Sequence, residues 1–263
     1  MSKKTVNSDN IRKLTLAAIL AALIVVLQVI GGFQIGPVPI TLTLIPIIVG
    51  AILLGPVYGT GLGLVFGAIT IILVYAGKDP FSLPLFERNA VAAWTLCLVK
   101  GAAAGFCPAI VFKAFHEKKY APSVLVALSG AFIAALGFVA GKMAKNAGTV
   151  KNLIVAAIVA LVAAGYLLLV RYALKKDTPA YYLAAMVAPV ANTGFYVVGM
   201  MIFFGDYLTE NAAGKNIFLF LIAAIAINFI VEFATSVIIS PSVASVAKKA
   251  FKPSKAPKTD EKA

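Results

Sequence analysis

The chain has 263 residues, of which 61% are hydrophobic and only 13% are charged, and its formal net charge is +13. Soluble domains are about half apolar and about a quarter charged, so this composition excludes an ordinary soluble protein and indicates an integral membrane protein. The basic residues lie at the ends of apolar runs and in the last residues, which is typical of membrane orientation and lipid headgroup contact rather than of nucleic-acid binding.

The sequence contains about eight apolar stretches that approach the length of ~20 residues needed to cross a bilayer as a helix. The predicted spans, in chain order, are 12–31, 38–54, 57–76, 90–115, 121–143, 151–174, 178–204 and 216–245. We therefore expect an all-α membrane protein with a single transmembrane domain over 12–247. A short N-terminal segment, 1–11, precedes it, and a polar, Lys- and Pro-rich tail, 248–263, should be disordered.

The distribution of Lys and Arg predicts the orientation of these spans. If both chain ends are cytoplasmic, the inner loops and the tail carry most of the basic residues, as the positive-inside rule requires. Lys142, Lys145 and Lys151 would then form a basic cluster on the outer side, against the rule. The sequence as a whole still favours a multi-pass protein of the cell membrane with both termini in the cytoplasm.

Small residues recur at helical spacing in the first and third spans. The first contains LTLAAILAAL, which holds two overlapping A-x-x-x-A pairs, and the third has a glycine at every fourth position. This spacing lets helix backbones approach closely in lipid. Each face could therefore pack inside the protein or dock another membrane protein. The residues are Ala17, Ala18, Ala21 and Ala22 in the first span and Gly59, Gly63 and Gly67 in the third.

Two predicted outer loops carry candidate binding residues. Phe33 and Gln34 lie in GGFQIGPVPI, where glycines would permit the movement that a lid needs. Arg88, Asn89 and Trp94 lie in KDPFSLPLFERNAVAAW. An arginine at the mouth of a pocket suits bidentate binding of a carboxylate. The alternative for Trp94 is membership of the interfacial aromatic belt.

Polar residues within the spans are the stronger candidates, because polar groups at membrane depth are costly to bury and mark functional sites. Asn192 and Thr193 follow a proline that should kink their helix and free a carbonyl. Asn228 and Glu232 are four residues apart, so they share a helix face. Lys100 lies well inside its span. The alternatives are a structural ion pair between Lys100 and Glu232 and simple interhelical hydrogen bonds from the asparagines.

No motif for catalysis or cofactor binding is present in the sequence. There is no G-x-x-x-x-G-K-[ST] P-loop, and the single histidine, His116, has no triad around it. Cys97 and Cys107 are too far apart on one predicted helix for a disulfide. We therefore expect no enzymatic activity, no metal and no cofactor.

Four motifs in this order make the chain resemble the substrate-binding subunits (S components) of energy-coupling factor (ECF) vitamin transporters, in the folate- and pantothenate-type group. They are LTLAAILAAL, GPVPITLTLIPIIVGAILLGPVYGTGLGLVFG, LVKGAAAGF and APVANTGF, within 12–116 and 178–245. The resemblance implies a six-helix core that binds one vitamin near the outer face. It also implies that the alanines of the first helix contact a transmembrane T component. Residues 121–174 depart from the family pattern, and we interpret them as an inserted, lipid-facing helical hairpin.

The favoured function is therefore capture of a small, anionic, water-soluble vitamin or precursor for ATP-driven uptake. Pantothenate is the first candidate, and folate or a pyridoxine-like compound comes next. The expected partners are the vitamin, the T component, two cytoplasmic ATPases and the lipid bilayer, with no nucleic acid. Two alternatives remain open: a secondary transporter coupled to protons through Glu232 and Lys100, and a membrane scaffold whose small-residue faces only bind partners.

Overall fold

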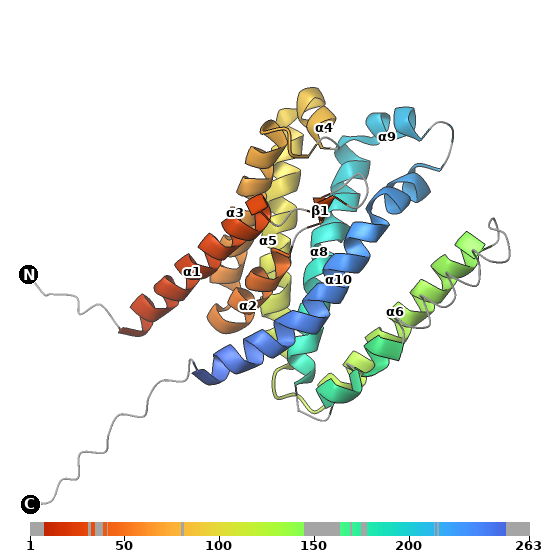
Figure 1. Cartoon of the computed structure of the whole chain (residues 1–263). Helices are drawn as coiled ribbons and strands as arrows, with labels where there is room; N and C mark the ends of the chain where they lie inside the picture. The colour runs from red at the N-terminus through yellow and green to blue at the C-terminus, as the bar shows by residue number, and fades with distance from the viewer. Residues whose placement is uncertain are drawn as a thin grey trace, which may run out of the picture.

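The computed structural model describes residues 8–30, 33–34, 39–40, 42–79, 82–144, 164–168, 170–174, 178–212, 214 and 216–250 (Figure 1). The long helices are α1 (Ser8–Ile30), α3 (Pro56–Tyr75), α5 (Ala90–Phe115), α6 (Ala121–Ala144), α8 (Pro179–Phe203) and α10 (Ile217–Ala250). The short helices are α2 (Leu44–Leu54), α4 (Leu83–Arg88) and α9 (Gly205–Asn211). Residues 164–168 and 170–174 are also helical.

The helices confirm the predicted all-α membrane fold. Five of the described helical stretches are long and apolar enough to cross a membrane, namely Asp9–Ile30, Pro56–Tyr75, Ala90–Phe115, Pro179–Phe203 and Asn228–Ala250. Shorter apolar helices include Leu44–Leu54 and Ala121–Ala134. Most of the predicted span 151–174 lies outside the described residues, as does the tail beyond residue 250.

The second predicted span begins later than the sequence suggested. Its first residues form strand β2 (Pro39–Ile40), which pairs antiparallel with β1 (Phe33–Gln34), and the helix begins only at Leu44. Proline has no N–H to donate, and it disfavours the helical conformation of the residue before it. The prolines at 37 and 39 therefore account for an extended entry into α2.

The glycine face of α3 is an internal packing surface. A Cβ atom at Gly59 would lie 2.5 Å from the carbonyl oxygen of Gly105 on α5, and one at Gly67 would lie 2.6 Å from that of Cys97. Gly63 meets the backbone of Gly101 in the same way. Any side chain here would push the two helices apart, so the predicted internal packing is confirmed and the docking alternative for this face is wrong.

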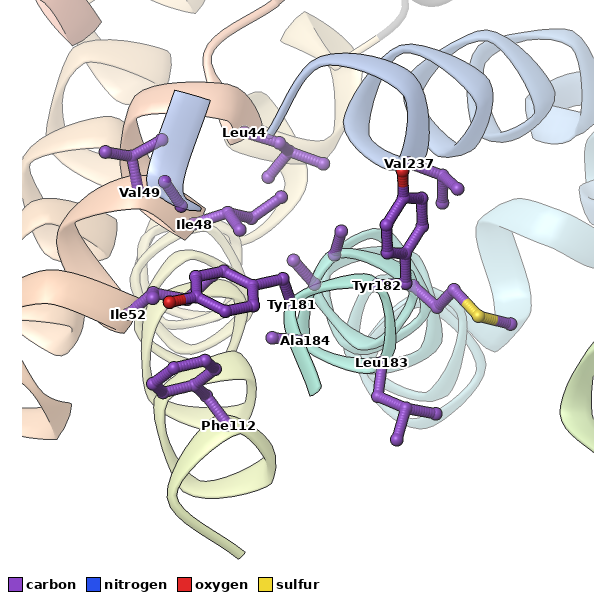
Figure 2. Packing of buried hydrophobic residues seen from close by; sticks show 14 of the residues in the cluster. Leu44, Ile48, Val49, Ile52, Phe112, Tyr181, Tyr182, Leu183, Ala184 and Val237 are labelled. Atoms are coloured by element: carbon purple, nitrogen blue, oxygen red, sulfur yellow. The ribbon is translucent and has the colours of Figure 1, made fainter. Parts of the chain in front are cut away.

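The main core lies where α2, α5 and α8 meet, with α10 packed alongside. Figure 2 shows Phe112 of α5 facing Tyr181 of α8, with Ile48 and Ile52 of α2 beside them. The Phe112 and Tyr181 ring centroids are 4.8 Å apart in an edge-to-face arrangement, which is a favoured geometry for aromatic pairs. This packing makes α8 a central element of the bundle, so the polar residues of α8 are held against both α5 and α10.

Helix α6 stands to one side of the bundle (Figure 1) and is attached to it by a few specific contacts. Ser129 is 2% exposed and lies 3.2 Å from the hydroxyl of Tyr166, which in turn donates to the sulfur of Met186 at 3.1 Å. The Phe132 ring stacks on Phe233 of α10, with centroids 4.2 Å apart. The region predicted as an inserted hairpin is therefore peripheral, yet it is anchored to α8 and α10.

Candidate substrate-binding site

Several predicted site residues line one small polar cavity inside the bundle. The cavity has a volume of about 40 Å³. It lies between α5, α8, α10 and the segment that links α3 to α4. The sequence-predicted residues on its wall are Lys100, Asn192, Thr193 and Asn228, and Asp79, Ser82, Tyr196 and Ile225 join them.

Glu232 is 4% exposed and belongs to the same cluster. The Asn192 amide donates a hydrogen bond to its Oε2 at 3.4 Å, and the Asn228 side chain, one turn earlier on α10, also hydrogen-bonds it. The oxygens Asn192 Oδ1 and Asn228 Oδ1 are buried without a partner among the described residues. A buried polar atom without a partner costs about 1–3 kcal/mol. Two acceptors of this kind beside a cavity are therefore well placed to receive N–H or O–H groups of a ligand or of water.

The Lys100 ammonium points into this cluster, and none of the residues that the structure describes offers it a carboxylate at salt-bridge distance. Its Nζ lies 4.9 Å from the centroid of the Tyr196 ring and 5.9 Å from that of Phe66, within the range of cation–π attraction. Among the described residues, no salt bridge joins Lys100 to Glu232. Lys100 and Glu232 therefore lie in one cluster, but they do not form the close ion pair that was the alternative to a role in substrate binding.

Arg88, Asn89 and Trp94 are exposed at the protein surface and do not line the cavity. The Arg88 guanidinium makes a bidentate ion pair with Glu210 of α9, with Nη1 3.2 Å from Oε1, and it covers the Tyr207 ring at 5.2 Å. This hydrogen bonding lowers the pKa of the Glu210 carboxyl below its ordinary value. Asn89 caps α5 by accepting from the backbone N–H of Ala92. Arg88 and Asn89 therefore each have a structural partner.

Trp94 is 45% exposed, and its Nε1 donates to the Tyr75 hydroxyl at 3.2 Å. Phe33 and Gln34 form β1, and the paired strand β2 lies against α10. Nothing is described of the Phe33 and Gln34 side chains. Their predicted part in the site therefore stays a prediction.

Sequence reasoning missed Asp79, Ser82 and Tyr196. Asp79 is 7% exposed, and its carboxylate accepts from the Ser82 backbone N–H at 3.1 Å and from the Ser82 hydroxyl at 2.6 Å. In the sequence Asp79 resembles an ordinary loop charge. Tyr196 follows Asn192 by four residues, so the same helix-face argument that paired Asn228 with Glu232 could have found it.

The alanine motif of α1 divides between two environments. Ala21 packs against the core and Ala17 is partly buried, whereas Ala18 and Ala22 are exposed. The exposed pair continues a row at four-residue spacing with Leu14 and Val26, which are 65% and 49% exposed. This row is called the α1 outer face below. The two middle residues of this face are small and all four are apolar, which suits close contact with another helix.

The fold is a bundle of apolar helices of a membrane protein, and it encloses a small cavity with polar walls. A family model described as the ECF transporter, substrate-specific component, matches residues 12–143, about half of the chain. The chain belongs to this family and is therefore a substrate-specific transporter subunit with several membrane-spanning helices. No curated protein matches it. The match includes most of α6, the helix at the start of the region interpreted from the sequence as an insertion. It ends before α8 and α10, the helices that carry Asn192 and Asn228.

Proposed function

We propose that this subunit captures a small, water-soluble vitamin or vitamin precursor for uptake by an ECF importer, with a T component and two ATPases as partners. One observation carries the proposal: Lys100 and two asparagine oxygens that have no partner in the described part of the chain line one cavity within the membrane-spanning bundle. A polar cluster that served only to pack helices would gain nothing from leaving acceptors unsatisfied.

The charges of the cavity limit the ligand. Lys100 favours one carboxylate through a charge-assisted hydrogen bond. Asp79 on the wall opposes a second negative charge, and the oxygens of Asn192 and Asn228 accept from N–H or O–H donors. A monoanion with hydroxyl and amide donors meets these requirements. Pantothenate, which combines one carboxylate with hydroxyl and amide groups, is therefore the first candidate. Folate, which has two carboxylates, and a pyridoxine-like compound, which lacks the carboxylate, meet the requirements less well and come next.

A volume of about 40 Å³ is too small for any vitamin, since ligand pockets measure roughly 300–1,000 Å³. Binding therefore has to widen the cavity. The β1–β2 pair is the element we propose to move, because β2 lies against α10, which carries Asn228 and Glu232. In this proposal Phe33 and Gln34 sit on the lid, and ligand binding separates β2 from α10.

We further propose that the α1 outer face docks the T component, with both chain ends in the cytoplasm. The exposed, small-residue surface at Ala18 and Ala22 supports this assignment. A second candidate function is proton-coupled transport by the chain alone. The buried Glu232 carboxylate, hydrogen-bonded by two asparagines, favours that alternative.

Binding by the purified protein tests the proposed substrate class. Titration calorimetry with pantothenate, folate and pyridoxine, each added to detergent-solubilised protein, should reveal one ligand that binds one-to-one. Mass spectrometry of small molecules released by denaturing the protein provides an independent identification. Binding of none of the three, together with release of no small polar molecule from the protein, would contradict the proposal.

A further inference from the structure

A second and larger cavity lies at the end of the bundle where α5 ends and α8 begins, toward the bottom of Figure 1. It has a volume of about 700 Å³. We call it the basal pocket. Its wall combines the end of α5, the start of α8 and the last turns of α10, and includes Tyr181, Tyr182, Ser242, Val246, Lys248 and Lys249. The cluster around Lys100 shares none of these residues.

One cation of the basal pocket, Lys248, is held in place by its neighbours. The Lys248 Nζ lies 2.9 Å from His116 Nε2 and 4.6 Å from the centroid of the Phe112 ring. Burial and the neighbouring Lys248 charge lower the pKa of His116 below its ordinary value of 6.5. The imidazole is therefore neutral near pH 7, and its Nε2 accepts from the ammonium. Lys249, in the next position of α10, adds a second positive charge to the wall.

Hydroxyl groups lie on the same wall as these cations. Ser242 presents a hydroxyl to the pocket and tyrosines complete the polar wall, whereas the hydroxyls of Thr178 and Ser245 donate to the carbonyl oxygens of Ala173 and Ser242. The one acidic residue on the described wall is Glu117, whose side chain is 85% exposed and lies 3.5 Å from His116. Two lysines beside the Ser242 hydroxyl suit an anion that has several acceptor oxygens, and lysine is a common ligand of phosphate.

The position of the pocket indicates where such an anion would come from. The pocket opens at the ends of membrane-spanning helices, the level at which phospholipid headgroups lie. Basic pockets between transmembrane helices at this level are suited to anionic headgroups. Val246 and Pro241 add apolar surface on the same wall, as an attached acyl chain requires. Both leaflets present phosphate, so a headgroup can reach the pocket in either orientation of the chain.

We propose that the basal pocket binds a phosphate-bearing anion, and specifically the headgroup of an anionic phospholipid. This site is separate from the one proposed for the vitamin, so either assignment can fail without the other. The headgroup phosphate lies between Lys248 and Lys249 and accepts from Ser242. Val246 contacts the start of the acyl chain.

Filling the pocket while keeping its charge gives the sharpest test. Val246→Trp adds bulk at a wall residue that is 68% exposed, and Val243→Trp adds the same bulk at a residue of α10 that is 44% exposed and lies outside the wall. Each variant is purified from nanodiscs of phosphatidylcholine with one fifth phosphatidylglycerol, and native mass spectrometry measures the retained lipid. We expect Val246→Trp to retain about tenfold less phosphatidylglycerol than the wild type and Val243→Trp to match the wild type.

A charge series tests the cations in the same assay. Lys248→Gln/Lys249→Gln should also reduce phosphatidylglycerol retention about tenfold. Lys113→Gln, at an exposed position of α5 outside the pocket, should leave it unchanged. Equal retention by all variants would overturn the proposal. Stabilisation by inorganic phosphate without phosphatidylglycerol retention would show a soluble anion in the pocket and would overturn the lipid assignment.

Discussion

Replacing Lys100 with methionine removes the cation of the Lys100 cluster while keeping a long, flexible side chain. The ammonium lies 4.9 Å from the Tyr196 ring and lines the same cavity as Asn192 and Asn228. A charge-assisted hydrogen bond contributes about 1.5–3 kcal/mol. Its loss should weaken vitamin binding by roughly ten- to a hundredfold, since about 1.4 kcal/mol corresponds to a factor of ten. Titration calorimetry with the vitamin that the wild type binds measures this change.

A loss of stability has to be separated from a loss of affinity in this variant. Glu232 is 4% exposed, and removing a nearby cation leaves a buried carboxylate with less compensation. Lys100→Met/Glu232→Gln removes both charges, so it should recover thermal stability without recovering affinity. Lys113→Met provides a control for loss of a lysine from the exposed end of the same helix. If Lys100→Met binds the vitamin at wild-type strength and unfolds at the wild-type temperature, Lys100 has no role in the site.

The remaining predictions concern docking, packing and the outer ion pair. Ala18→Leu/Ala22→Leu should abolish uptake by the assembled transporter while vitamin binding persists, because bulk on the α1 outer face blocks close helix contact; loss of binding would instead indicate internal packing. Gly63→Ala should lower stability by roughly 1–3 kcal/mol in thermal unfolding, whereas Gly61→Ala, with nothing within 4 Å of its Cβ, should not; equal stability would refute the α3–α5 packing. Glu210→Gln should lower the unfolding temperature at pH 7. The difference from the wild type should shrink as the pH falls below 4.5, since the bound arginine lowers the pKa of this carboxyl and the stabilisation is lost on protonation. A difference that stays constant with pH would rule out the ion pair as its cause.

The sequence predicted the parts of the site that follow from local geometry. Asn228 and Glu232 share a face because helices repeat every 3.6 residues, and the structure places both in the Lys100 cluster. The same periodicity identified the glycines of α3. The matching glycines at 101 and 105 lie in LVKGAAAGF, but periodicity within one helix does not show which other helix its face contacts.

Other features depend on contacts between distant segments. Arg88 appeared suited to a substrate carboxylate, yet its partner is Glu210, a residue 122 positions later on α9. Asp79 resembled a solvated loop charge, and only the fold shows that it is 7% exposed on the cavity wall. Such pairings depend on how helices are arranged in space, which hydrophobic periodicity does not determine.

Uptake by reconstituted protein tests the central claim most directly. Proteoliposomes that contain this chain alone, or this chain with a T component and two ATPases, are loaded with ATP and given radiolabelled vitamin outside. The account predicts that the chain alone binds the vitamin without accumulating it, and that accumulation requires the partners and hydrolysable ATP. Accumulation by the chain alone, driven by a pH gradient, would contradict the account and would establish the proton-coupled alternative.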